Sequence, residues 1–161
     1  MDTLSHLETL ERLGLSLLLG LMLGIEREWR SKPAGLRTYA LVCEGSALFM
    51  MGSLLLGEEV RKTGASNYDP SRIGSTIVQG IGFLAGGVIL TQGKRIRGVT
   101  TAADIWVTAA IGLLIGAGFF FLAISATIAT IIVLVPVQWL HRRLTLENGT
   151  QADNGSEDNI D

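Results

Sequence analysis

The residues with the clearest chemical potential are charged side chains placed between two apolar segments. The stretch Ile25–Tyr39, IEREWRSKPAGLRTY, contains two glutamates and four basic residues. Glu26–Arg30 and Glu28–Lys32 have the spacing, four residues with the acid first, at which opposite charges pair on a helix. Basic residues beside a span set its orientation in a membrane, but orientation does not require glutamates. We therefore predict a functional site in this stretch.

A second group of polar side chains lies within the apolar segments, at Glu44, Gln79 and Asp104. A carboxylate inside a bilayer is costly unless it is protonated, paired or hydrated, so it is retained for function or for a structural hydrogen bond. Because Mg²⁺ is usually held by only one or two carboxylates, these three residues could line a polar path for Mg²⁺ or protons. For Glu44 both interpretations stay open. The neighbouring Cys43 is interpreted as a small packing residue.

No motif in the sequence predicts an enzyme. HExxH, the phosphate-binding loop and GxSxG are absent, and GIGFLAG departs from the dinucleotide-binding motif by one residue. His6 and His141 fall on opposite sides of the predicted membrane, and the single cysteine excludes a CxxC site. We expect no catalytic residues, no metal site and no cofactor, with only an association with Mg²⁺ left open. A net charge of −2 without a basic patch argues against nucleic acid as a partner.

The elements that must position these residues are membrane helices. The chain has 161 residues, 20 of them glycine, and a mean hydropathy of +0.41, which is high for a soluble domain of this length. A span needs about 20 apolar residues. The apolar segments predict an all-α, polytopic bundle of about five spans, at residues 10–25, 36–56 and 73–90 and two within 105–137. A break at Gly116–Gly118 would separate the last two, whereas a single bent helix would leave four.

The distribution of basic residues orients this bundle. With five spans, nine Lys and Arg residues fall on one side and four on the other. The first side is predicted to be cytoplasmic, with the N-terminus outside and the C-terminus inside. Trp29, Trp106 and Trp139 would lie at the same interface. Residues 1–143 are interpreted as a transmembrane domain whose first partner is the lipid bilayer, and residues 144–161 as an acidic, disordered cytoplasmic tail.

Small residues recur at helical spacing in three of the segments. They indicate close helix packing within one bundle or a homo-oligomer, because small residues let helix backbones approach in a bilayer. In the third segment we expect one stripe to face protein (Ser75, Gln79, Gly82, Gly86) and another to face lipid (Ile77, Ile81, Leu84, Val88). A comparable stripe in the fourth segment is Asp104, Thr108, Gly112 and Gly116. Asp69 with Pro70, and Thr100 with Thr101, are expected to begin the third and fourth helices.

Three blocks of the sequence resemble the MgtC/SapB family of bacterial inner-membrane proteins. They are GIEREWRSKPAGLRTYALV, DPSRIGSTIVQGIGFLAGGVIL and GKRIRGVTTAADIWVTAAIGLLIGAG, and the resemblance runs from about Leu13 to Leu140. It implies a multi-pass protein of the bacterial inner membrane, with about five spans. It also implies a link to magnesium limitation and, in pathogens, to survival inside phagocytes. Family members are viewed as regulators of other membrane proteins, the ATP synthase among them.

The resemblance also carries a set of motif residues onto this chain. They are Glu26, Arg27, Glu28, Lys32, Pro33, Gly35, Arg37, Thr38, Asp69, Pro70, Arg72, Gly80, Gly82, Phe83, Leu84, Gly98, Thr100, Thr101, Ala102 and Trp106. Two features depart from the family pattern. FLAGG stands where the family usually has FLGAG, and the soluble C-terminal domain of many members is replaced by the acidic tail. The sequence therefore predicts a short member of the family.

Three functions are compatible with these observations. The first is a regulator of other membrane proteins that acts in magnesium limitation or virulence-type stress adaptation, through the charged rim and the glycine faces. The second is a transporter or channel for Mg²⁺ or protons, with Glu44, Gln79 and Asp104 lining its path. The third is a structural subunit of a membrane complex. We expect the functional site in the stretch Ile25–Tyr39 and on the facing loop, Lys94–Thr101.

Overall fold

The computed structural model describes residues 4–64, 68–92 and 95–135. Within these ranges the chain forms five helices and one short antiparallel hairpin. The elements are α1 (His6–Trp29), α2 (Leu36–Lys62), α3 (Ser71–Val88), β1 (Leu90–Gln92), β2 (Arg95–Arg97), α4 (Val99–Gly116) and α5 (Phe120–Leu134). The predicted all-α bundle is confirmed. Trp139 and the predicted tail lie outside the described residues.

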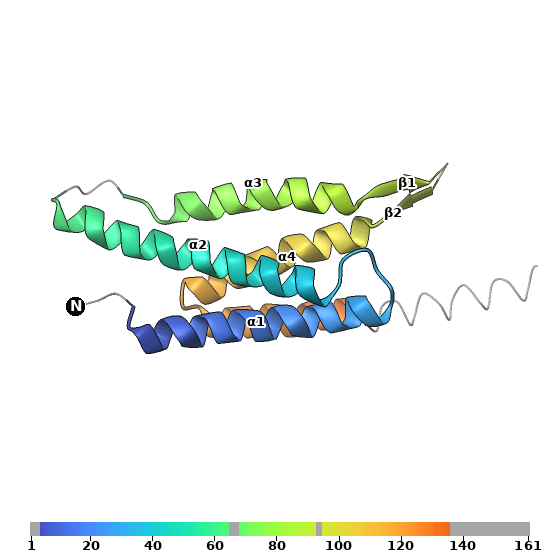
Figure 1. The fold of residues 1–161 in the computed structure, drawn as a ribbon, viewed down its shortest axis with the longest axis horizontal. Helices are drawn as coiled ribbons and strands as arrows, with labels where there is room; N and C mark the ends of the chain where they lie inside the picture. Colours follow the sequence, from blue (N-terminus) through green and yellow to red (C-terminus); the bar gives the residue numbers. More distant parts are fainter. Residues whose placement is uncertain (1–3, 65–67, 93–94, 136–161) are drawn as a thin grey trace, which may run out of the picture.

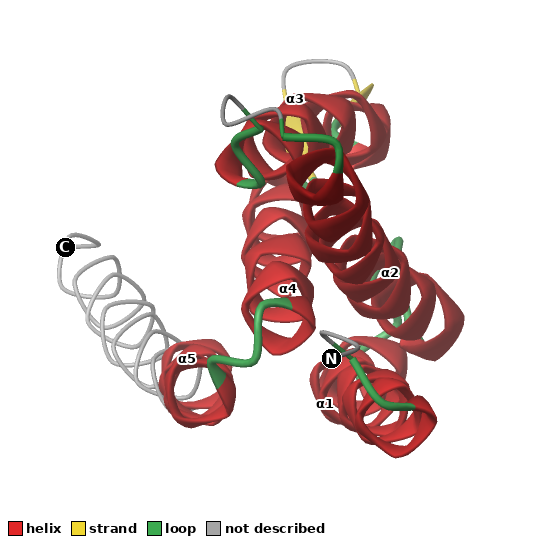
Figure 2. Cartoon of the chain, turned by 90° about the vertical axis from the view of Figure 1, so that its left-hand side faces the viewer, coloured by secondary structure: helices red, strands yellow, loops and turns green. Residues whose placement is uncertain are grey.

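Consecutive helices run in opposite directions (Figure 1). One end of the bundle therefore gathers the end of α1, the start of α2, the β1–β2 hairpin and the start of α4. The other end holds the start of α1, the α2–α3 connection and the turn between α4 and α5. Helix α4 is central, since it contacts each of the other four helices (Figure 2). The two stretches predicted to form the site thus lie at the same end.

Two of the described helices, α2 and α4, are long and apolar enough to cross a membrane, and α5 is a shorter apolar helix. The predicted break after α4 is confirmed, because α4 ends at Gly116 and α5 begins at Phe120. Gly118 supplies the turn with a φ of +87°, in the left-handed region that favours glycine. The single bent helix is therefore excluded. Five spans and the outside N-terminus remain predictions.

The helix starts differ from the predicted ones at two places. Helix α3 has Pro70 as its N-cap, one residue after the predicted Asp69. Helix α4 has Gly98 as its N-cap with a φ of 90°, so Thr100 and Thr101 lie inside the first turn. A side chain at Gly98 would collide with the carbonyl of Val88. The hairpin, which the sequence did not predict, imposes this tight entry into α4.

Glycines on α1 and α4 bring these helices against α2. A Cβ at Gly24 would lie 2.7 Å from Leu36 Cα, and one at Gly116 would lie 2.8 Å from Met50 Cβ. Asp104, Thr108, Gly112 and Gly116 are all buried, as their spacing predicted. Packing within the bundle therefore accounts for the two GxxxG pairs on α1 and α4.

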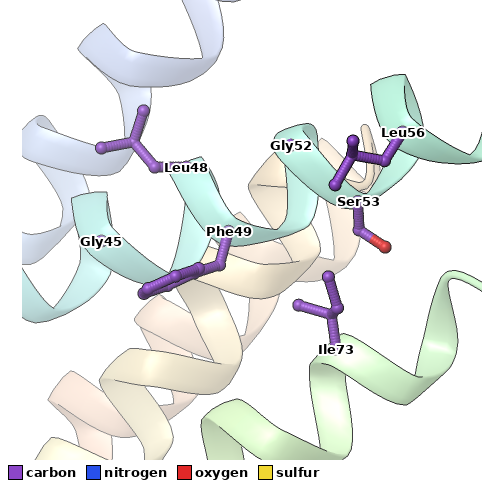
Figure 3. Close-up of a pocket in the computed structure, with 7 residues that line it drawn as sticks. All are labelled: Gly45, Leu48, Phe49, Gly52, Ser53, Leu56 and Ile73. Carbon is purple, nitrogen blue, oxygen red and sulfur yellow. The ribbon is translucent and has the colours of Figure 1, made fainter.

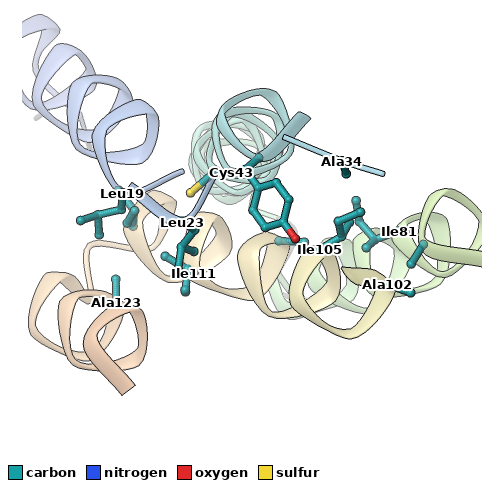
Figure 4. Packing of buried hydrophobic residues seen from close by; sticks show 13 residues of the cluster. Leu19, Leu23, Ala34, Cys43, Ile81, Ala102, Ile105, Ile111 and Ala123 are labelled. Carbon is teal, nitrogen blue, oxygen red and sulfur yellow. The ribbon is translucent and has the colours of Figure 1, made fainter. Parts of the chain in front are cut away.

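The predicted faces of α3 are reversed in the structure. Ile81 is buried, and Ile77 and Val88 pack against the buried cluster, which also contains Ala102 and Ile105 of α4. The opposite stripe is exposed (Ser75, Gln79, Gly82, Gly86). Leu84, the remaining residue of the predicted lipid-facing stripe, is exposed as expected. The large side chains Ile77, Ile81 and Val88 thus pack in the same cluster as Ala102 and Ile105 of α4. Figure 4 shows this cluster reaching from Leu19 to Ile81.

Candidate functional site

Three helices place ionisable side chains together at the end that holds the hairpin. Arg27 is in the last turn of α1, Tyr39 is in the first turn of α2, and Asp104 is near the start of α4. Arg27 and Tyr39 have no exposed surface, and Asp104 is 4% exposed. A fully buried guanidinium is unusual, because long charged side chains are almost never buried unless they are paired.

The buried side chains join partly exposed ones of α1 in a group that we call the charged cluster (Glu26, Arg27, Arg30, Tyr39 and Asp104). Tyr39 Oη donates a 2.9 Å hydrogen bond to Asp104 Oδ2, and Arg27 Nε lies 3.7 Å from the same oxygen. Arg27 also pairs closely with Glu26. Glu26 Oε1 lies 2.6 Å from Arg30 Nε, which confirms the predicted pair four residues apart. Two carboxylates and two guanidiniums thus balance one another.

The charged cluster does not satisfy all of its own hydrogen-bonding atoms. Arg27 Nη1 and Asp104 Oδ1 are buried and have no hydrogen-bond partner within the described residues. Buried polar atoms without a partner are rare in folded proteins, and they cost free energy in a medium of low dielectric. The charged cluster is therefore suited to polar contact or rearrangement rather than to stability alone.

The charged cluster consists of hydrogen-bond donors, acceptors and opposite charges. No group of three or more His, Cys, Asp or Glu side chains suited to a metal ion occurs among the described residues. Within the charged cluster the phenol of Tyr39 donates to Asp104, and the Arg27 guanidinium lies between two carboxylates with which it can pair.

At the junction between α1 and α2, Glu28 makes a different contact from the predicted one. Helix α1 continues into the charged stretch as far as Trp29 and then ends. Because Lys32 lies beyond that end, the predicted Glu28–Lys32 pair is not formed in the described structure. Glu28 Oε2 instead accepts a 3.2 Å hydrogen bond from the backbone N–H of Leu36, at the start of α2. A side chain at Gly35 would overlap this carboxylate.

The other predicted motif residues do not form one site. Those at the end that holds the charged cluster are Lys32, Pro33, Gly35, Arg37, Thr38, Gly98, Thr100, Thr101, Ala102 and Trp106. Asp69, Pro70 and Arg72 lie at the opposite end of the bundle, where α3 begins. Gly80, Gly82, Phe83 and Leu84 lie along α3 and are exposed. Lys94, part of the predicted facing loop, is outside the described residues.

The three residues of the predicted ion path are separated. Asp104 belongs to the charged cluster, Gln79 is on the exposed face of α3, and Glu44 is half-buried on α2. Glu44 has no hydrogen bond or ion pair with another described residue. Two hollows lie beside α2, and neither is lined by any of the three residues. The described helices therefore offer no common polar path for them.

Tyr39 is the functional candidate that sequence reasoning missed. It ends the charged stretch, and a phenol buried in an apolar helix usually needs a hydrogen-bond partner, which was the available signal. Its partner, Asp104, is 65 residues away in the sequence, so the contact depends on the fold. Arg12 was missed for the same reason. Its Nη1 donates a 2.6 Å hydrogen bond to the carbonyl of Gly116, 104 residues away.

Comparison with known proteins identifies relatives of this chain by sequence. The model of the MgtC family matches residues 13–143. The chain is 45% identical over 136 residues to the Escherichia coli K12 protein named "Putative magnesium transporter YhiD", covering 79% of this chain and 63% of that one. It is 47% identical over 130 residues to the protein slr0014 of Synechocystis, covering 80% of this chain and 50% of that one.

A further relative is the protein MgtC of Salmonella typhimurium LT2, which is 45% identical over 113 residues. That match covers 70% of this chain and 45% of the relative. The chain thus spans between about half and two thirds of the length of these relatives. No solved structure matches it.

Proposed function

Since this chain belongs to the MgtC family, we propose that it is a multi-pass protein of the bacterial inner membrane that regulates other membrane proteins during magnesium limitation or related stress. It acts by binding, without catalysis and without a resident cofactor. Its partners are helices of other membrane proteins, and the ATP synthase is the first candidate because of the family resemblance. The apolar helices α2 and α4 support the membrane location.

The outward glycine face of α3 is the observation that carries this proposal. A Cβ added at Gly82 or Gly86 would meet nothing within 4 Å, so no described element covers these positions. Gln79 and Ser75 continue the same exposed stripe toward the start of the helix. In a bilayer, small residues and side-chain amides are the groups through which helices associate. The face is therefore suited to a helix from another protein.

The charged cluster supplies the regulatory half of the proposal. It lies at the predicted cytoplasmic end, and it joins α1, α2 and α4 through charges that are balanced but incompletely bonded. A partner that changes how these helices pack would change which atoms pair. Packed interfaces between helices switch between discrete arrangements rather than deforming continuously. A regulator can use such a switch to signal whether its partner is bound.

The test replaces glycines of the outward face with a larger residue, which should block this face and leave the packing of the bundle unchanged. We expect the pair Gly82→Leu and Gly86→Leu to abolish the rescue of growth in low magnesium in a strain lacking this protein, and to abolish crosslinks to a membrane partner. The matched control is Gly14→Leu on α1, since a Cβ there also meets nothing within 4 Å. Full growth and unchanged crosslinking by the α3 variant would remove this face from the function.

Transport of Mg²⁺ or protons is the second candidate, and two observations favour it. One relative carries the name of a magnesium transporter. Glu44 is a half-buried acid that has no ion pair among the described residues, as expected for a residue that contacts water or an ion. Purified protein in liposomes should then move Mg²⁺ or H⁺ down a gradient, and Glu44→Gln should abolish the flux. Liposomes that show no flux above empty ones would leave regulation as the function.

A further inference from the structure

A groove on the molecular surface runs between α2 and α3. It has a volume of about 830 Å³, and its walls are mostly apolar, with Leu41 and Phe49 on α2 and Ile77 and Leu84 on α3. Helix α3 packs chiefly on α4 rather than on α2, which leaves this space open. A groove on the side of a membrane bundle is in contact with lipid, so its shape and charge decide which lipid fits.

The groove is continuous with a second hollow of about 430 Å³ further along α2. The two share Gly45, Phe49 and Ile73 (Figure 3). Together they extend along α2 from Arg37 to Leu56, which is about 29 Å at 1.5 Å per residue. The hydrocarbon core of a bilayer is about 30 Å thick. The combined groove therefore matches the depth of the apolar part of a membrane.

The two helices that flank the groove are not parallel. Helices α2 and α3 lie close together where they are connected and diverge toward the start of α2 (Figures 1 and 2). Arg37 and Thr38 line the groove at the end where the helices are farthest apart, which we call its wide end. An acyl chain is thinner than a helix, which is about 10–12 Å across, so we expect an acyl chain along the groove with a headgroup at the wide end.

Arg37 makes the wide end positive. It is exposed, it lines the groove, and it has no acidic partner among the described residues. Arg27 and Arg30, at the same end of the bundle, are both held by Glu26. A guanidinium binds phosphate oxygens through two parallel hydrogen bonds, which makes arginine a good phosphate ligand. The free cation therefore sits where a lipid phosphate would lie.

We propose that the groove between α2 and α3 binds an anionic phospholipid, with an acyl chain along the apolar walls and the phosphate on the Arg37 guanidinium. This rests on the membrane location in the proposed function but not on regulation. Lipid at this position packs beside α2 and α3 together, and α3 also carries the outward glycine face. Binding therefore links the lipid composition of the cytoplasmic leaflet, which is the anionic one, to the presentation of that face.

The experiment measures lipid retained by the purified, delipidated full chain in native mass spectrometry. The two probes are phosphatidylglycerol and phosphatidylcholine with identical acyl chains. The wild type should prefer phosphatidylglycerol by about fivefold, which is what one arginine near the headgroup supplies. Arg37→Ala should lose the preference, and Arg37→Lys should keep part of it. Arg61→Ala is the matched control, because Arg61 is an exposed cation near the other end of α2.

A second variant tests the apolar part of the groove. A Cβ at Gly80 meets nothing within 4 Å and points along the groove wall, so Gly80→Phe should reduce retention of both lipids. Gly87→Phe, on the same helix but away from the groove, is its control. Equal retention of the two lipids by the wild type, or unchanged preference in Arg37→Ala, would overturn the proposal. Displacement of the lipid by inorganic phosphate alone would assign Arg37 to free phosphate.

The outcome separates this inference from the proposed regulatory function. If the wild type shows no lipid preference while the α3 variant still has its growth defect, the lipid site alone is refuted. A lipid preference that depends on Arg37, in a protein whose α3 variant grows normally, refutes the regulatory face alone. Capture of a partner helix in the groove after delipidation would likewise overturn the lipid assignment.

Discussion

An arginine of α1 reaches α4 at each end of the bundle, but the two arginines meet different partners. At the hairpin end, buried Arg27 faces the carboxylate of Asp104 and shares it with Tyr39. At the other end, Arg12 donates to the carbonyl of Gly116, where α4 ends, and stacks over the ring of Phe120. The first contact joins two buried charges, whereas the second completes a helix terminus.

The difference between the two arginine contacts indicates which end of the bundle contributes mainly to stability and which to function. A guanidinium on a terminal carbonyl satisfies an acceptor that would otherwise be orphaned, and it keeps part of its surface near solvent. A buried ion pair gains little net stability, because the desolvation of both charges offsets their attraction. Each end contains a buried atom without a hydrogen-bond partner among the described residues, Arg12 Nε at one end and Arg27 Nη1 and Asp104 Oδ1 at the other. Within the same part of the chain, only the hairpin end also keeps a buried ion pair. We infer that the buried ion pair at the hairpin end is retained for function rather than for stability.

The largest effect should follow from removing one partner of the buried pair. Asp104→Ala leaves the buried Arg27 with Glu26 as its remaining carboxylate and leaves the buried Tyr39 hydroxyl without its acceptor. Removing one partner from such a buried charged group costs about 3–5 kcal/mol of unfolding free energy. We expect the variant in detergent to show a strongly lowered Tm or not to accumulate at all. Thermal unfolding followed by circular dichroism measures the change.

A double variant tells apart the two roles of the buried pair. In Arg27→Met with Asp104→Leu both charges are replaced by apolar groups of similar volume, so stability should return close to that of the wild type. Growth in low magnesium should stay lost if the pair serves function. A double variant that grows normally would show that the hairpin end, like the other end, is only structural.

The second largest effect should be at the opposite end. Arg12→Ala removes a charged hydrogen bond to Gly116, worth about 1.5–3 kcal/mol. Because this contact closes the turn between α4 and α5, the loss should appear in Tm but not in growth once the protein has folded. Arg12→Lys, which keeps the charge, should recover part of the stability. A growth defect in Arg12→Ala at a temperature where it is folded would contradict the division between the two ends.

A smaller effect is expected from Tyr39→Phe. The change removes one hydrogen bond to Asp104 and adds no cavity, so stability should fall by about 1 kcal/mol. Asp104 Oδ2 keeps Arg27 nearby, which limits the loss. If the phenol only packs, growth should be as in the wild type. If Tyr39 holds Asp104 in one arrangement, growth in low magnesium should fall more than the Tm predicts, and a Tyr39→Leu control would separate packing from hydrogen bonding.

The sequence predicted the helices better than it predicted the contacts between them. The Gly116–Gly118 break, the Glu26–Arg30 pair and the buried face of α4 all follow from spacing within one helix, and they are confirmed. The contact between Tyr39 and Asp104 needs two helices to be placed first. For α3, periodicity defined two faces but could not say which one meets α4. Within the described bundle the large side chains of α3, not its small ones, meet the core, and the small-residue face stays exposed.

The smallest effect should come from Glu28, whose carboxylate at the hairpin end accepts a hydrogen bond from the backbone of α2. Glu28→Gln keeps an oxygen that can accept from Leu36 N–H but removes the negative charge at the start of α2, a loss of about 0.3–1 kcal/mol that salt should weaken further. Glu28→Ala should cost more, because it also removes the acceptor. Stability measured at low and high salt distinguishes these parts. If Glu28→Gln were as damaging to growth as Glu28→Ala while losing less stability, the charge itself would act in function, and the functional end would extend from the charged cluster to the junction of α1 and α2.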